Sequence, residues 1–258
     1  MLTRDNIEWA ASLLEKDPDQ ATLVIISVLK SRNLIREIRI REALEQRNLG
    51  HNDRASEILL LAIKDAGGGT LLGELYHHLG TNAQGAGNFT KALEYLSLAL
   101  ELRMDAGDNL GAAYTTFQIA MCKIMSRASE TELIFEFQNA KRIARAALNE
   151  QGLSAEHKGN MHQNLAFCLQ LESFFEDAIH EYQNVLQFRE EAEHGKEPLE
   201  RRGTAMTLAR IAECLMGLHR YDEATEQALR ALAIFQNIAD VNRIKQVEAT
   251  LQQIAEGR

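Results

Sequence analysis

The three cysteines of this chain are evenly spaced, at positions 122, 168 and 214, so that 46 residues separate each from the next. Each one ends a similar four-residue phrase, in which an aliphatic residue and an alanine come first: Ile119–Cys122, Leu165–Cys168 and Ile211–Cys214. A phrase that returns at a period of about 20 to 50 residues is typical of solenoids and other repeat arrays. The function of such a chain is therefore expected in a presented surface rather than in an enclosed active site.

The composition indicates a helical protein and argues against nucleic acid as a partner. Only two prolines, Pro18 and Pro198, occur in 258 residues, which favours helix almost throughout because proline breaks helical runs. Hydrophobic residues make up 45% of the chain, enough to form a core. The 28 lysines and arginines against 37 acidic residues give a net charge of −9, which repels a polyphosphate backbone.

The cysteine number and the hydropathy pattern predict a reducing, cytoplasmic setting without membrane insertion. Three widely spaced cysteines include no C-x-x-C pair, and an odd number does not suit a disulfide framework. The N-terminal residues lack the basic and apolar regions of a secretory leader. No window approaches the roughly 18 apolar residues that a membrane span needs.

The clearest repeating unit runs from Leu75 to Leu102 and consists of two stretches with apolar residues at helical spacing around a turn at Gly87-Asn88. This unit resembles a tetratricopeptide repeat, a family whose pattern is an aromatic residue, Leu-Gly, a turn glycine before an aromatic residue, and two alanines seven residues apart. The matching residues are Tyr76, Leu79-Gly80, Gly87, Phe89, Ala92 and Ala99.

The resemblance implies an all-α, right-handed α-solenoid of about six helix pairs, followed by a C-terminal capping helix over residues 237–256. The expected units are residues 3–31, 32–67, 70–105, 109–150, 155–192 and 200–236, within one domain. The first alanine of each second helix is assigned to Ala21, Ala55, Ala92, Ala140, Ala178 and Ala224. With this assignment about eight extra residues lie around Ser126–Glu130, and a second expansion runs from Arg189 to Arg202.

The chemical motifs of enzymes and metal sites are not found in the sequence. The cysteines follow the small residue of each first helix by two positions, where a tetratricopeptide repeat usually holds a small buried side chain, so we expect them to pack in the core. Gly67-Gly68-Gly69-Thr70 lacks the Gly-Lys-Ser/Thr ending of a phosphate loop. We therefore expect no catalytic residue, no metal and no cofactor.

The resemblance places ligand contacts on the first helices, which line the concave side of such an array. Their outward positions form a neutral and partly apolar groove without the lysine of a carboxylate clamp. The amides are suited to hydrogen-bond an extended peptide, and the aromatic residues to receive its apolar side chains. The candidate residues are His77, Thr81, Gln84, Tyr114, Phe117, Met121, Asn160, Gln163, Asn164, Phe167, Arg210 and Glu213.

Three hypotheses about function follow from the sequence. The first is an interaction module that binds a protein or an extended peptide in the groove, on its own or as the sensory or regulatory part of a larger bacterial signalling protein. The second is a self-assembling scaffold that uses its terminal helices or its convex face. An enzyme ranks last, because an activity would need a domain outside this chain.

Overall fold

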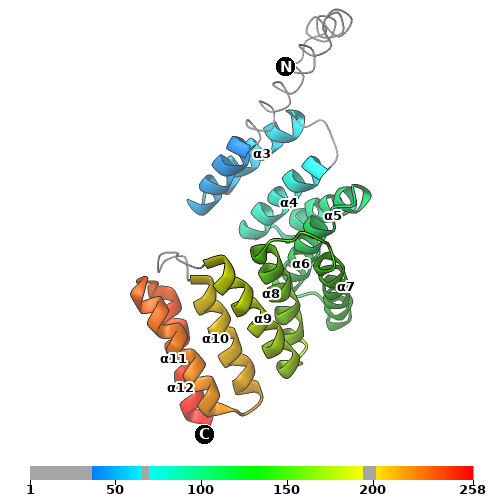
Figure 1. Ribbon diagram of the computed structural model, residues 1–258. Coiled ribbons are helices and arrows are strands. Elements are labelled where there is room, and N and C mark those ends of the chain that lie inside the picture. The colour runs from blue at the N-terminus through cyan, green and yellow to red at the C-terminus, as the bar shows by residue number, and fades with distance from the viewer. Residues whose placement is uncertain (1–36, 66–69, 194–201, 258) are drawn as a thin grey trace, which may run out of the picture. The chain divides into compact units, whose positions relative to one another are not determined.

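The computed structural model describes residues 37–65, 70–193 and 202–257, and the chain divides into two compact units, Met1–Leu102 and Arg103–Arg258 (Figure 1). The described residues form helices joined by short turns and contain no strand. The expected first helix pair, with Ala21, and most of the expected expansion from Arg189 to Arg202 lie outside the described residues. We describe each unit by itself.

The N-terminal unit contains helix over residues 37–48, then α3 (Asn52–Asp65), α4 (Thr70–Gly85) and α5 (Phe89–Asp105), whose last turn belongs to the second unit. Residues 37–48, α3 and α4 share a core of aliphatic residues and alanines that includes Ile40, Leu59 and Leu75. Helices α4 and α5 approach closely at Gly80, where an added Cβ would lie 2.5 Å from Leu96 Cγ.

After the last turn of α5, the described residues of the C-terminal unit form seven helices that alternate in direction along the chain (Figure 1). They are α6 (Asn109–Met125), α7 (Glu130–Leu148), α8 (Ala155–Leu171), α9 (Phe175–Glu193), α10 (Arg202–Gly217), α11 (Tyr221–Asn237) and α12 (Val241–Gly257). In its larger core the alanines Ala178, Ala212 and Ala224 pack among the bulky side chains of Tyr182 and Phe235. Small residues beside large ones allow helices to pack at short distance.

The three cysteines are buried, as expected from the sequence. Cys122, Cys168 and Cys214 are at most 1% exposed, and none of them forms a disulfide. Cys214 belongs to the core just described, and Cys168 packs in a second cluster with Ala120, Phe137 and Ala140. Each sits on a first helix, α6, α8 or α10, and packs there as a small hydrophobic residue.

The structure corrects the predicted position of the first alanine in one helix. Ala55, Ala92, Ala178 and Ala224 each lie three residues after the first residue of their helix, but in α7 that position is Leu133. Ala140 is therefore equivalent to Val185 of α9, seven residues further along. Both Ala140 and Ala147 are buried. The pair therefore matches the sequence pattern, but seven residues later in the helix than the first alanine of the other units.

The predicted eight-residue insertion around Ser126–Glu130 is also wrong. Helix α6 ends at Met125 and α7 begins at Glu130, so only four residues connect them. Ser129 caps α7 in a capping box with Glu132, which fixes the first residue of the helix. Seven of the eight residues disappear once Leu133 replaces Ala140 as the equivalent position, and the remaining one lies in the turn, which has four residues where the turn between α8 and α9 has three.

The predicted C-terminal helix is confirmed as α12. Val247 and Ile254 are buried against the preceding helices, whereas Val241 is 59% exposed. Among the described helices none is long and apolar enough to span a membrane.

Candidate functional site

The first helices of the C-terminal unit contact one another through the residues predicted for the groove. Between α6 and α8, the Nδ2 of Asn160 donates a hydrogen bond to the Tyr114 hydroxyl at 3.0 Å. The rings of Phe117 and Phe167 meet edge to face with centroids 5.9 Å apart. Burial raises the pKa of the Tyr114 phenol, so its hydroxyl stays protonated at neutral pH.

The contacts continue from α8 to α10. The Arg210 guanidinium lies over the Phe167 ring, 4.9 Å from its centroid, and donates to Glu213 Oε2 at 2.9 Å. Gln170 Nε2 donates to the same carboxylate oxygen at 2.8 Å, and the hydroxyl of the buried Tyr182 donates to Gln170 Oε1 at 2.8 Å. The orientation of the Gln170 amide is thus set from both sides, because its oxygen must accept and its nitrogen must donate.

Two amide groups of α8 keep one polar atom each for another partner. Asn160 uses its Nδ2 on Tyr114, which leaves Oδ1 as an acceptor, and Gln163 accepts through Oε1 from Arg189, which leaves Nε2 as a donor. Among the described residues these two remaining atoms have no partner. Side chains three residues apart lie on one face of a helix, so the acceptor and the donor are neighbours.

Asn164 is more deeply placed than a groove residue is expected to be. Its side chain is only 7% exposed, and its Nδ2 has no hydrogen-bond partner among the described residues. A buried amide donor without a partner costs about 1–3 kcal/mol, so Asn164 differs from the partly exposed amides of Asn160 and Gln163. Met121 of α6 is partly buried.

We call the partly exposed groove candidates of these three helices, together with Gln170, the first-helix face. Its members are Tyr114, Phe117, Met121, Asn160, Gln163, Phe167, Gln170, Arg210 and Glu213. One arginine and one glutamate, paired with each other, are its only charged residues, so the face is neutral.

The three candidates of the N-terminal unit lie on α4, and all are partly buried. Thr81 Oγ1 accepts a hydrogen bond from Arg47 at 3.1 Å and donates to the His78 carbonyl at 3.0 Å. The His77 ring meets His78 edge to face, 5.7 Å between centroids. Gln84 follows one turn after Thr81. The contact between Arg47 and Thr81 joins two first helices, as the contacts of the second unit do.

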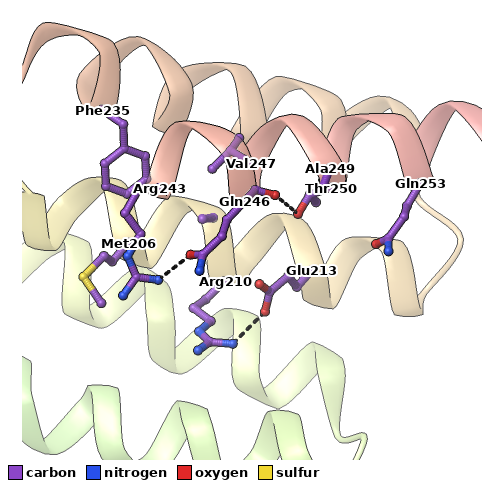
Figure 2. Close-up of a pocket in the computed structure, with 11 residues that line it drawn as sticks. Met206, Arg210, Glu213, Phe235, Arg243, Gln246, Val247, Ala249, Thr250 and Gln253 are labelled. Carbon is purple, nitrogen blue, oxygen red and sulfur yellow. Dashed lines mark hydrogen bonds and ion pairs between the residues drawn. The ribbon is translucent and has the colours of Figure 1, made fainter. Parts of the chain in front are cut away.

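A pocket of about 410 Å³ lies where α10 faces α12 (Figure 2). Arg210 and Glu213 of the first-helix face line one side of it. Figure 2 shows Arg243 and Gln246 reaching from α12 toward Met206 and Arg210 of α10, with Arg243 Nη1 donating to Gln246 Oε1 at 2.8 Å. The other lining residues are Ala209, Phe235, Val247, Ala249, Thr250 and Gln253.

No group of histidine, cysteine and acidic residues within the described ranges is arranged to hold a metal ion. Burial raises the pKa of the Cys168 and Cys214 thiols to about 12, so neither is a thiolate nucleophile at neutral pH.

Comparison with solved structures identifies which known proteins share this fold. No protein-family model matches the sequence, and no curated protein does. Among solved structures, a thermophilic TPR protein of Thermus thermophilus aligns with a TM-score of 0.62 and 16% identity, over 84% of this chain and 99% of that one. The chain has the fold of a tetratricopeptide-repeat array. The all-α solenoid class predicted from the sequence is confirmed.

Two further structures share this fold. BtubC (BKLC) from P. vanneervenii aligns with a TM-score of 0.59 and 17% identity, over 90% of this chain and 88% of that one. A signal transduction ATPase with numerous domains and a tetratricopeptide repeat sensor, from Pyrococcus horikoshii, aligns with a TM-score of 0.63 and 17% identity over 96% of this chain. The alignment spans 37% of the length of the Pyrococcus protein.

Two groups of residues at the candidate site were not predicted from the tetratricopeptide pattern. Tyr182 and Arg189 belong to the second helix α9, and only the folded hairpin brings them to Gln170 and Gln163. The pocket residues of α12 carried a usable signal, because their spacing of three, four and three residues puts them on one helical face. These residues are Arg243, Gln246, Thr250 and Gln253.

Proposed function

We propose that this chain is a non-catalytic interaction module that binds an extended polypeptide on its first-helix face. The observation that carries the proposal is a pair of partly exposed amides on α8, whose Asn160 Oδ1 and Gln163 Nε2 have no partner among the described residues. An extended peptide presents N–H and C=O groups in alternation, so it supplies the complementary donor and acceptor. The rings of Phe117 and Phe167 lie beside these amides and offer contact area to its apolar side chains.

The neutral charge of the face supports a peptide over a polyanion. Arg210 and Glu213 neutralise each other, and the chain as a whole carries a net charge of −9. Nucleic acid would need an excess of basic residues on the binding surface. We also assign the chain to a reducing compartment, the cytoplasm, because its three cysteines form no disulfide.

A sensory role within a larger signalling protein is a more specific form of this proposal. Its support is the similarity in fold to the Pyrococcus protein, which is described as having a tetratricopeptide repeat sensor. In either form the first-helix face is the surface that meets the polypeptide.

The proposal is tested by selecting, from a random peptide library, the peptides that bind the full chain. The C-terminal end of each displayed peptide is fused to the display carrier. The selected peptides are then measured against Phe167→Ala. We expect this substitution to weaken binding about tenfold or more, since truncating one central aromatic contact commonly costs over 1 kcal/mol.

The matched control is Phe135→Ala. Phe135 is 67% exposed on the second helix α7 and lies outside the first-helix face, so its removal should leave binding unchanged. Both variants are checked for unaltered helicity and unfolding temperature. If Phe167→Ala binds as the wild type does, or if Phe135→Ala alone loses binding, the assignment to the first-helix face is wrong.

A further inference from the structure

The pocket between α10 and α12 contains one more positive charge than negative charge. Its charged lining residues are Arg210, Glu213 and Arg243. The Glu213 carboxylate is already engaged, because Arg210 and Gln170 both donate to its Oε2. The pocket thus has an excess of positive charge, whereas the chain as a whole carries a net charge of −9.

The unbalanced charge belongs to Arg243. Its guanidinium donates to the neutral amide of Gln246. The nearest acidic residue along the chain, Asp240, accepts from Arg202 Nε at 2.8 Å and from the Arg243 backbone N–H at 3.2 Å. The pKa of Asp240 is lowered mainly by its hydrogen bond from Arg202 and to a smaller extent by the charge of Arg243. Within the described part of the chain, however, the Arg243 guanidinium forms no ion pair. A guanidinium offers five N–H donors, so it has several left for a ligand.

The remaining walls of the pocket define the shape of the group that it accepts. Phe235 and Val247 are buried and close the pocket with apolar surface, and Met206 lies beside the Arg243 side chain (Figure 2). Thr250 and Gln253 add neutral polar groups on the α12 side. A ligand that fits has a short apolar stem and one negative charge at its end.

We propose that this pocket holds the side chain of an aspartate or glutamate of the polypeptide bound on the first-helix face. Its methylene groups lie against Met206 and Val247, and its carboxylate accepts from Arg243. This inference rests on the proposed function, because Arg210 and Glu213 belong both to the first-helix face and to the pocket. It adds a sequence requirement to that function: an acidic residue at one position of the ligand.

The test uses the same display library, in which the fused C-terminal end leaves no free terminal carboxylate, so an enriched acid must be a side chain. Selection on the wild type should enrich aspartate or glutamate at one position. Selection on Arg243→Glu should lose that preference and favour lysine or arginine there. Changing the acidic residue of a selected peptide to its amide should weaken binding to the wild type about tenfold, the effect of losing a hydrogen bond between charged groups.

The same peptide pair measured on Arg243→Gln completes a double-mutant cycle, and there the acid and the amide should bind equally. Arg230→Glu is the matched control, since Arg230 on α11 also donates to a neutral glutamine, Gln227, but lies outside the pocket. It should keep the acidic preference.

The outcomes separate this inference from the proposed function. If the wild type selects peptides whose binding depends on Phe167 but shows no acidic preference, or if Arg243→Glu keeps that preference, the pocket assignment is overturned and the first-helix face stands. If no peptide is enriched on the wild type, both proposals fail together.

Discussion

At the scale of single residues, the amide of Gln163 gives the sharpest test of backbone recognition. Its Oε1 accepts from Arg189, and its Nε2 is left for a ligand carbonyl. Gln163→Glu preserves the shape and the contact with Arg189 but removes the donor. We expect peptide binding to weaken roughly three- to tenfold, because one hydrogen bond is lost and a carboxylate faces a carbonyl oxygen.

Isothermal titration with a selected peptide measures this effect. Gln227→Glu on α11, where Oε1 also accepts from an arginine, Arg230, serves as the control for added charge. Equal affinity of Gln163→Glu and the wild type would mean that Nε2 makes no contact with the peptide.

The cysteines provide a second prediction at this scale. Burial raises the pKa of Cys168 and Cys214 to about 12 and also raises that of Cys122, so the thiolate fraction is very small at pH 8. The native protein should therefore react slowly with a thiol reagent at pH 8. All three thiols should react only when the protein is unfolded. Rapid reaction of any one thiol in the native state would show that its helix opens.

At the scale of helices, the close approach of α4 and α5 depends on Gly80. A Cβ at this position would lie 2.5 Å from Leu96 Cγ and 3.2 Å from the Ala92 carbonyl oxygen, so α4 and α5 would have to separate. Gly80→Ala should lower the free energy of unfolding by about 1–3 kcal/mol, the usual cost of overpacking.

Gly85 on the same helix has no atom within 4 Å of its added Cβ, and Gly85→Ala is the matched control. It should leave stability unchanged or raise it by up to about 1 kcal/mol, since alanine favours helix over glycine. Urea unfolding compares the two variants, and a Gly80→Ala protein as stable as the wild type would show that the helices are not packed at this point.

The helix-pair organisation could be predicted from the sequence because its signals are local. Glycine and alanine at fixed distances report close packing within one hairpin, as at Gly80 and Ala92. The same rule failed in α7, where Leu133 takes the place of the first alanine and the later pair Ala140 and Ala147 imitates the pattern. Sequence spacing alone does not distinguish a shifted pattern from an insertion.

The site was predictable only in part, for a physical reason. Periodicity indicates which side of a helix Tyr114, Asn160 and Phe167 occupy, but not which atom of an amide is already engaged. The bonds that decide this join residues 26 to 46 positions apart, such as Gln163 with Arg189 and Tyr114 with Asn160. They follow from the packing of successive hairpins, which local patterns do not encode.

At the scale of the whole molecule, the structure bears on the scaffold hypothesis. The exposed side of α12 is polar, with Gln246, Glu248 and Gln252, and Val241 is its one exposed large apolar residue. An exposed helix face of this composition offers no apolar patch for self-association. We predict a monomer whose mass, measured by sedimentation velocity, stays constant over a dilution series.

A dimer that dissociates on dilution would contradict this prediction and favour self-assembly. Phe135→Ala would then distinguish the faces, because Phe135 occupies on α7 the position that is Glu94 on α5 and Glu226 on α11. Loss of the dimer in this variant would assign assembly to the outer surface of the second helices.

Photo-crosslinking shows directly whether a polypeptide lies on the first-helix face. A photoreactive phenylalanine analogue is placed at position 167 or at position 135, and each protein is irradiated with a peptide selected on the wild type. We expect a crosslinked peptide from position 167 and none from position 135. Crosslinking from position 135 but not from position 167 would contradict this expectation.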